Sequence, residues 1–479
     1  MASNQRVEVE DFQAFPPLSP VSQIINSPIL SLSVIAVLEL EDPFDKSQTI
    51  ELLRDVLVPT NHRFSSIIVT DKKGVQRWKK VDELKIEEHI IIPTFPLGLL
   101  SVDDYNVHFN NYLSEIAMDP LPVTRPPWEV HVIIYPTRNG SGGSIVFKLS
   151  HALGDGYALM GTVMSCLKRA DDPSKPISLP MPSARVAAGE MRSKWSRMAR
   201  FVFMCCNTVS DFTRGMLQGS VLEDDKTVIR SALPRMESVP IEISSVSFSV
   251  DQIRSIKAEV GATVNDVVMG LLYYAIQLYI QKMGQNSSGS RRVTALCVQN
   301  MRKFRGDESI EDMVKGKIWG NQFGLSILSL PSISGDIANM DPLEFIIKAK
   351  QQTSRSKNSS AVYFASKMLN LMSSKGATQF IHSTLKNTSL VVSNVPGPMQ
   401  KVVLLDHALN SIYFTVVGTP QSLFFTIMSY NGELKLVART EKGFIDSELL
   451  LSFIKEAFEK FYAATHGKDA MVENSKNGF

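Results

Sequence analysis

His151 carries more chemical information than any other residue because of the residues around it. A strand-like stretch, residues 144–149, leads into His151, Asp155 and Gly156 follow it, and a helix-like stretch begins at Tyr157. An imidazole changes charge near neutral pH and can take the proton of a hydroxyl group whose oxygen attacks a carbonyl carbon. The pattern predicts that His151 is a general base. The alternative is a buried histidine in a tight turn, where Asp155 caps the helix and Gly156 relieves backbone strain.

The sequence contains no competing catalytic motif. It has no G-x-S-x-G nucleophile elbow, no G-x-x-x-x-G-K-[ST] phosphate loop and no H-E-x-x-H zinc motif. For His131, on the strand-like stretch 128–135, we expect a packed or surface position in preference to a supporting role. The histidines other than His151 lack metal-ligand spacing, so we predict no metal site; they are His62, His89, His108, His131, His382, His407 and His466.

Length and composition indicate a folded chain of two domains. A chain of 479 residues is longer than a single hydrophobic core usually supports. The formal net charge of +2 and the absence of a basic block give no reason to expect a nucleic-acid partner. The cysteines have no C-x-x-C spacing, which predicts free buried thiols in a reducing compartment; they are Cys166, Cys205, Cys206 and Cys297.

Three segments bear on membrane association. The uncharged stretches 14–38 and 408–432 are interrupted by proline or glycine, and we predict buried strands there and no membrane-spanning helix. Residues 190–219 are amphipathic and basic at their start. Such a segment can lie on an anionic membrane surface, although a crossover helix packed on the core is the interpretation that we favour.

The order of strand and helix signals predicts two mixed α/β units joined by a crossover. The two units are an N-terminal domain (residues 1–182) and a C-terminal domain (residues 240–479). A linker with an amphipathic helix (residues 183–239) joins them. The predicted strands are 32–41, 63–70, 75–81, 128–135, 144–149, 241–250, 292–298, 323–330, 390–394, 423–429 and 434–439, and the predicted helices are 48–58, 104–118, 157–169, 262–283, 341–372 and 447–464.

The turn at His151 resembles the HHxxxDG motif of the wax ester synthase/diacylglycerol acyltransferase family, within the CoA-dependent acyltransferase superfamily. Ser150 stands where that family usually has the first histidine. The DFGWG motif of the soluble plant acyltransferases that decorate phenolics is missing, which argues against that branch. Further segments are similar to the plant branch of the family in order and spacing: 17–20 (PLSP), 125–131 (RPPWEVH), 263–267 (TVNDV), 300–302 (NMR), 319–324 (WGNQFG) and 393–398 (SNVPGP).

The resemblance implies two chloramphenicol-acetyltransferase-like domains with the active site in a tunnel between them. An acyl group would move from acyl-CoA, a co-substrate, to a hydroxyl, with no bound cofactor and no covalent enzyme intermediate. His151 would be the base, and Asp155 would hold the turn by pairing with a basic residue. Gly156 would keep space for the thioester. Asn265 is our candidate donor to the tetrahedral oxyanion, with an ordinary helix-start residue as the alternative.

The resemblance also implies the acceptor, a long-chain alcohol that gives a wax ester or diacylglycerol that gives triacylglycerol. Residues 412–417 and 423–428 are candidate walls for the alkyl chains, or ordinary strand core. The alternatives are a transferase with a small alcohol or amine acceptor and a non-catalytic acyl-CoA or lipid-binding relative, which Ser150 keeps open. Because such substrates live in bilayers, we expect a membrane surface as partner, at the cytosolic face of the endoplasmic reticulum, with the plasma membrane as a second location.

Overall fold

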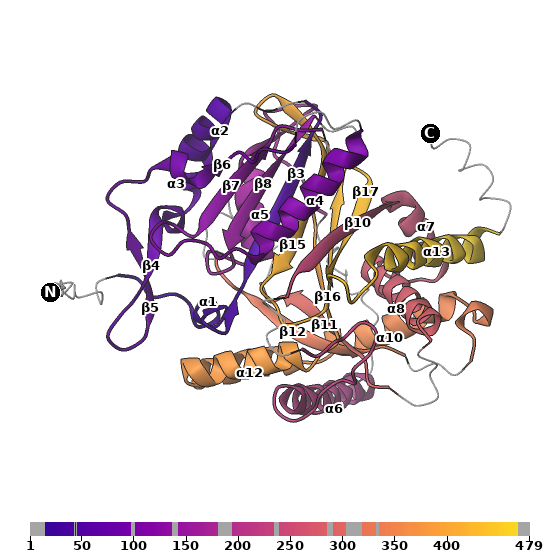
Figure 1. Ribbon diagram of the computed structural model, residues 1–479. Helices are drawn as coiled ribbons and strands as arrows, with labels where there is room; N and C mark the ends of the chain where they lie inside the picture. Colours follow the sequence, from indigo (N-terminus) through magenta and orange to yellow (C-terminus); the bar gives the residue numbers. More distant parts are fainter. Residues whose placement is uncertain are drawn as a thin grey trace.

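Two mixed β-sheets organise the chain (Figure 1). The computed structural model describes residues 15–42, 44, 46–96, 101–136, 142–180, 194–233, 239–284, 291–302, 319–331 and 335–467. Within these residues, one sheet has seven strands and the other has six. Two small sheets pair β1 (Asn26–Ser27) with β2 (Leu30–Ser31) and β4 (Ser66–Thr70) with β5 (Gln76–Lys80). The mixed α/β fold expected from the sequence is confirmed.

The seven-stranded sheet is built around β3, an apolar strand that is buried on both faces. Its strands, in spatial order, are β6 (Ile90–Ile91), β7 (Trp128–Ile133), β8 (Gly143–Ser150), β3 (Ser33–Leu40), β15 (His407–Val417), β14 (Val402–Leu404) and β9 (Leu167–Arg169). β3 pairs antiparallel with both β8 and β15. Residues 402–417 therefore complete a sheet whose other strands come from residues 33–169. The domain boundaries at 182 and 240 stay a prediction.

Among the described residues, β12 is the last strand at one edge of the six-stranded sheet. Its strands, in spatial order, are β10 (Ile241–Ser249), β17 (Glu433–Glu441), β16 (Leu423–Tyr430), β13 (Leu390–Val395), β11 (Thr294–Asn300) and β12 (Phe323–Ser329). The hairpin of β16 and β17 turns at Asn431 and Gly432, which have φ angles of 46° and 84°. Both residues tolerate positive φ, as a tight two-residue hairpin loop requires. The strands predicted over 423–429 and 434–439 are confirmed, and this turn joins them.

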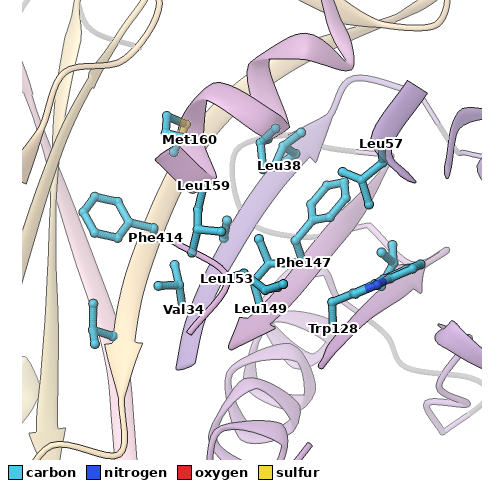
Figure 2. Packing of buried hydrophobic residues seen from close by; sticks show 14 of the residues in the cluster. Val34, Leu38, Leu57, Trp128, Phe147, Leu149, Leu153, Leu159, Met160 and Phe414 are labelled. Atoms are coloured by element: carbon cyan, nitrogen blue, oxygen red, sulfur yellow. The ribbon is translucent and has the colours of Figure 1, made fainter. Parts of the chain in front are cut away.

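Side chains of both sheets meet in the space between them. Figure 2 shows part of the core that lies between the two sheets. Phe147 of β8, Phe414 of β15 and Leu159 of α5 (Gly156–Ser165) belong to this core. Successive residues of a strand point to opposite faces. On β16, Phe424 therefore lies in this core, whereas Phe425 lies in the core on the far side of the second sheet. The second sheet thus separates these two cores, and its near face borders the first sheet. A third core lies where α4 (Val102–Met118) packs, and Ile35 of β3 and Ile241 of β10 belong to it.

Helices cover the far face of the second sheet, where α8, α10 and α13 pack together (Figure 1). Thr263 and Asp266 form a capping box that starts α8, as the sequence predicts. A Cβ atom on Gly270 of α8 would lie 2.8 Å from the Cα of Ile346, so the absence of a side chain there lets α10 approach. The α-helices are α1 (Pro20–Ile24), α2 (Lys46–Leu52), α3 (Val58–Thr60), α4 (Val102–Met118), α5 (Gly156–Ser165), α6 (Lys194–Gln218), α7 (Val250–Glu259), α8 (Val264–Lys282), α10 (Leu343–Lys357), α11 (Ala361–Leu371), α12 (Ser374–Lys386) and α13 (Ser447–His466).

Two helix predictions need correction, and two helices were missed. The helix predicted over 341–372 is two helices, because the chain turns at Asn358, whose N–H bonds to carbonyls of the last turn of α10. The helix predicted over 157–169 ends at Ser165, because residues 167–169 pair with β14. Helix α12 and helix α7 were not predicted, since each is short and rich in polar residues.

The cysteines are free, but they are not all buried as predicted. Cys166 is buried and Cys297 is partly buried, whereas Cys205 and Cys206 are exposed on α6. The prediction was wrong for this pair because one face of α6 points to solvent. In the described part of the chain, no helix combines the length and apolarity needed to cross a membrane. Of the predicted crossover 183–239, residues 183–193 and 234–238 lie outside the described residues.

Candidate active site

The turn between β8 and α5 fixes the position of His151. β8 ends at Ser150, and the N–H of His151 donates to the carbonyl of Leu32 at 2.9 Å, which ties the turn to the start of β3. Helix α5 then begins at Gly156, with Asp155 as its N-cap. The Asp155 carboxylate accepts the N–H of Ala158 at 3.1 Å, as N-cap aspartates do. His151 is thereby held at the C-terminal end of a central strand, and its side chain is buried.

Asn321 contacts both the ring and the backbone carbonyl of His151. Its Nδ2 donates to the carbonyl oxygen of His151 at 2.9 Å and to the hydroxyl of Ser22 at 2.9 Å. A carbonyl oxygen only accepts, so this contact fixes the amide with its Oδ1 toward the ring. Oδ1 lies 3.0 Å from His151 Nδ1 and therefore accepts the Nδ1 proton. The tautomer that this contact selects leaves Nε2 free to accept a proton.

The surroundings of His151 keep the imidazole neutral. Burial lowers the pKa of His151 below its ordinary value of 6.5, and the nearby Asp155 carboxylate opposes that shift. The ring of Phe323 packs against the imidazole in an edge contact, with ring centroids 5.7 Å apart and an interplanar angle of 60°. At neutral pH the side chain is therefore uncharged, which is the form that a general base needs.

Asp155 joins three segments through a buried ion pair. Its carboxylate accepts from Arg302 Nη1 at 2.7 Å and Nη2 at 2.9 Å, and from the backbone N–H of Gln322 at 2.8 Å. The side chains of Asp155 and Arg302 are 6% and 2% exposed. The pairing with a basic residue expected for Asp155 is present, and it connects α5 to the segments that follow β11 and precede β12. Both carboxylate oxygens are occupied by these contacts.

A cavity of about 580 Å³ lies between the two sheets and brings the predicted site residues together. His151, Asp155, Gly156 and Asn265 all line it. The remaining walls are mainly apolar. The predicted wall segments, residues 412–417 and 423–428, supply four side chains, and their other apolar side chains pack in the hydrophobic cores. Those four are Phe414, Val416, Phe424 and Ile427.

Gly156 and Asn265 both line this cavity, but Gly156 is partly buried and Asn265 is exposed. A Cβ atom on Gly156 would come within 3.2 Å of the Val395 side chain, so a larger residue would narrow the cavity beside His151. Asn265, on the first turn of α8, is exposed, and its Oδ1 accepts from Asn394 Nδ2 at 2.6 Å. That contact leaves the Nδ2 protons of Asn265 for another acceptor. Its role as oxyanion donor stays a prediction.

Ser150 does not line the cavity. Its hydroxyl accepts the N–H of Ala152 at 3.2 Å and so supports the turn. We therefore predict that Ser150→Ala keeps kcat and KM near their wild-type values and lowers stability by about 1 kcal/mol. Steady-state kinetics with a thermal melt checks this. A fall in kcat of about tenfold or more would instead assign Ser150 to the chemistry.

Asn321 and Arg302 are functional candidates that sequence reasoning missed. Asn321 lies in segment 319–324 and Arg302 lies in segment 300–302, both of which resemble the family. The sequence does not show which residues they contact. Trp319, from the same segment, donates its indole N–H to the carbonyl of Leu153 at 2.9 Å and supports the turn. His131 is packed, as favoured from the sequence, with its Nδ1 2.7 Å from the Tyr112 hydroxyl. Among the described residues, no cluster of His, Cys, Asp and Glu has a metal-site arrangement.

Comparison with known proteins identifies the family. The sequence model of the wax ester synthase/diacylglycerol acyltransferase catalytic domain matches residues 58–268, and that of the WS/DGAT C-terminal domain matches residues 319–461. Wax ester synthase/diacylglycerol acyltransferase 11 of Arabidopsis thaliana is 29% identical over 437 residues, which are 86% of this chain and 87% of the relative. Wax ester synthase/diacylglycerol acyltransferase 6 of the same plant is 26% identical, over 97% of this chain and 95% of the relative.

Solved structures share the fold. The wax ester synthase/diacylglycerol acyltransferase from Marinobacter aquaeolei VT8 has a TM-score of 0.58 at 16% identity, and the match covers 94% of this chain and 99% of that one. The starter condensation domain of rhizomide synthetase, solved with C8-CoA and Leu-SNAC, has a TM-score of 0.55 at 10% identity, over 97% of each chain. The two-domain fold expected from the resemblance is confirmed by these likenesses. With both domain models and most of its length matched, the chain belongs to the wax ester synthase/diacylglycerol acyltransferase family.

Proposed function

We propose that the protein is an O-acyltransferase that moves a fatty acyl group from acyl-CoA to a long-chain alcohol, to diacylglycerol, or to both. One observation carries the proposal: a neutral, oriented histidine lines a largely apolar cavity between the two sheets of a chain from this family. An apolar cavity with few polar groups suits long alkyl chains. A base at its wall suits the activation of a hydroxyl group.

His151 performs both proton transfers in the proposed mechanism. Its Nε2 takes the proton of the acceptor hydroxyl as that oxygen attacks the thioester carbonyl carbon. The tetrahedral oxyanion that forms needs a hydrogen-bond donor, for which Asn265 is the candidate. The carbon–sulfur bond then breaks, and His151 returns the proton to the departing thiolate. The products are the ester and free CoA, and no bond forms between protein and acyl group.

Acceptor preference tests the proposal. Purified protein is given palmitoyl-CoA with hexadecanol, with diacylglycerol or with a small alcohol, and the esters are measured by mass spectrometry. We expect turnover with hexadecanol, diacylglycerol or both, because the cavity walls are apolar. Activity with the small alcohol alone would overturn the choice of acceptor. Binding of palmitoyl-CoA with no turnover on any acceptor would point to a non-catalytic relative.

We also propose that α6 and α11 rest on a membrane surface, at the cytosolic face of the endoplasmic reticulum, with the plasma membrane as a second location. The two helices contact each other, and each exposes large apolar side chains. An amphipathic helix with such a face binds the bilayer interface. The exposed apolar side chains are Met198, Phe201, Val202, Phe203, Val209 and Leu217 on α6, and Tyr363, Phe364 and Leu371 on α11.

The double substitution Phe201→Ser and Phe203→Ser is expected to move the protein from the membrane to the soluble fraction. These side chains are 61% and 69% exposed, so their loss removes interfacial contacts and leaves the core intact. Fractionation of cell extracts measures the effect. Val123→Ser, at a site that is 82% exposed, is the control and should not change the distribution. A double variant that stays in the membrane fraction would contradict the proposed surface.

A further inference from the structure

A second cavity, of about 280 Å³, adjoins the first at the edge of the six-stranded sheet. It lies among β12, α6, α10 and α11. Both cavities share Leu325, Ser326 and Leu328 of β12 and Ser356 of α10. Because the same strand lines both, a long ligand can follow β12 from one cavity into the other.

Within the described residues, the outer edge of β12 has no strand partner, so its backbone groups can pair with such a ligand. β12 pairs only with β11 within the described sheet, and the N–H of Leu330 donates to the carbonyl of Val293. In an antiparallel pair, alternate residues direct both backbone groups toward the partner strand. The register therefore turns the N–H and C=O of Leu325 and Ile327 away from β11, into the second cavity. These are the groups with which an extended, amide-containing ligand pairs at a sheet edge.

The second cavity is also cationic. Its lining holds Arg214 of α6, Arg355 of α10 and a single carboxylate, Asp211. Asp211 lies 3.1 Å from Arg355, so that pair is largely neutralised. Arg214 Nη2 donates to the hydroxyl of Ser329 at 2.7 Å, and no carboxylate of the described chain forms an ion pair with it. Burial lowers the pKa of Arg214, but a guanidinium remains charged at neutral pH. Among the described residues Arg214 therefore has no carboxylate in ion-pair contact, although Asp224 and Asp211 attract it from farther away.

On the basis of the proposed function, we propose that the second cavity binds the phosphate groups of acyl-CoA, with Arg214 as their main cation. The pantetheine arm lies along the open edge of β12, where its two amides meet the backbone groups of Leu325 and Ile327. Phe323, beside His151, and Ser329, beside Arg214, are six residues apart, or roughly 20 Å in an extended strand. That span places the thioester at His151 while the phosphates reach Arg214.

Lys357 adds charge at the junction of the cavities. It lies on the last turn of α10, next to Ser356, and lines the first cavity. The CoA moiety carries a diphosphate and a separate phosphate, so it needs cations at more than one point. Charge-assisted contacts to phosphate are the strongest hydrogen bonds available for this.

Arg214→Gln tests the proposal, because the variant keeps a polar, hydrogen-bonding side chain, although a shorter one, and loses the charge. We expect the KM for palmitoyl-CoA to rise about tenfold or more with little change in kcat, since the lost contact is made equally before and during the reaction. S-palmitoyl-pantetheine, which lacks the nucleotide phosphates, should be used equally well by the wild type and the variant. Arg214→Lys should recover part of the affinity. Arg254→Gln, at an exposed arginine on α7, is the matched control.

Calorimetric titration with free CoA keeps this test independent of turnover. Weaker CoA binding by Arg214→Gln, with wild-type thermal stability, supports the site even if no acceptor is acylated. Unchanged CoA affinity in the variant overturns it, as does an equal loss of activity with palmitoyl-CoA and palmitoyl-pantetheine. The other source of phosphate is a lipid headgroup. Loss of binding to phosphatidylserine vesicles, with CoA affinity retained, would assign the cavity to lipid and overturn the proposal.

Discussion

Replacing His151 by alanine is expected to lower kcat by roughly 10²–10⁴-fold, the usual contribution of a general base. The substitution removes the proton acceptor at the cavity wall and leaves the Asp155–Arg302 pair in place. The fold should therefore persist. Turnover of palmitoyl-CoA with the preferred acceptor measures the effect, and circular dichroism checks the fold.

His407→Ala is the matched control, because His407 lies on β15 of the same sheet and does not line the cavity. Its kcat should remain near that of the wild type. Wild-type turnover by His151→Ala would exclude His151 as the base and reopen the non-catalytic interpretation.

The pH dependence of the wild type gives a second readout of the same group. Since burial lowers the pKa of His151 below 6.5, the neutral, active form predominates above that pH. Activity should rise with pH through the lowered pKa and be level by neutral pH. An acidic limb centred above 6.5 would contradict a buried neutral imidazole as the base.

Asp155→Asn is expected to destabilise the protein by about 3–5 kcal/mol, because it leaves the buried charge of Arg302 without its partner. Asparagine keeps the size of the side chain and can still cap α5 with its Oδ1. Its Nδ2 cannot accept from Gln322 N–H, so the loss includes that hydrogen bond as well as the ion pair. Chemical denaturation followed by tryptophan fluorescence measures the shift of the midpoint. Turnover should fall as well, since the pair connects the His151 turn to Gln322, next to Asn321.

Asp171→Asn is the control for Asp155→Asn, because it breaks the ion pair of Asp171 with Arg169 at the surface. An exposed pair contributes little, so its denaturation midpoint should barely move. If Asp155→Asn had the denaturation midpoint of the wild type but lower activity, Asp155 would act in the chemistry and not in holding the fold.

The sequence was informative wherever a local pattern determines local structure. The apolar run of β3, the Asn431–Gly432 hairpin and the capping box at Thr263 each depend on residues a few positions apart. The turn at His151 belongs to the same class. Its strand, its N-cap and its helix are contiguous in the chain, so their order was predictable.

The contacts that complete the site are not local. Asn321 lies 170 residues after His151, and Arg302 lies 147 residues after Asp155. No periodicity or propensity shows such a partner, although both residues stand in segments that resemble the family. The division at Asn358 was missed for a related reason, because it has no proline or glycine to mark it and depends on how α10 and α11 pack.

The pairing of β3 with β15 has a consequence for biosynthesis. β8 and β3 emerge from the ribosome early, but β15 follows Ser150 by about 250 residues, which takes roughly 10–50 s at ordinary rates of translation. Throughout that interval one edge of the apolar strand β3 has no partner, and unpaired apolar edges promote aggregation. The nascent chain should therefore depend on holding chaperones until residues 407–417 are made, and heterologous expression should improve when chaperones are abundant.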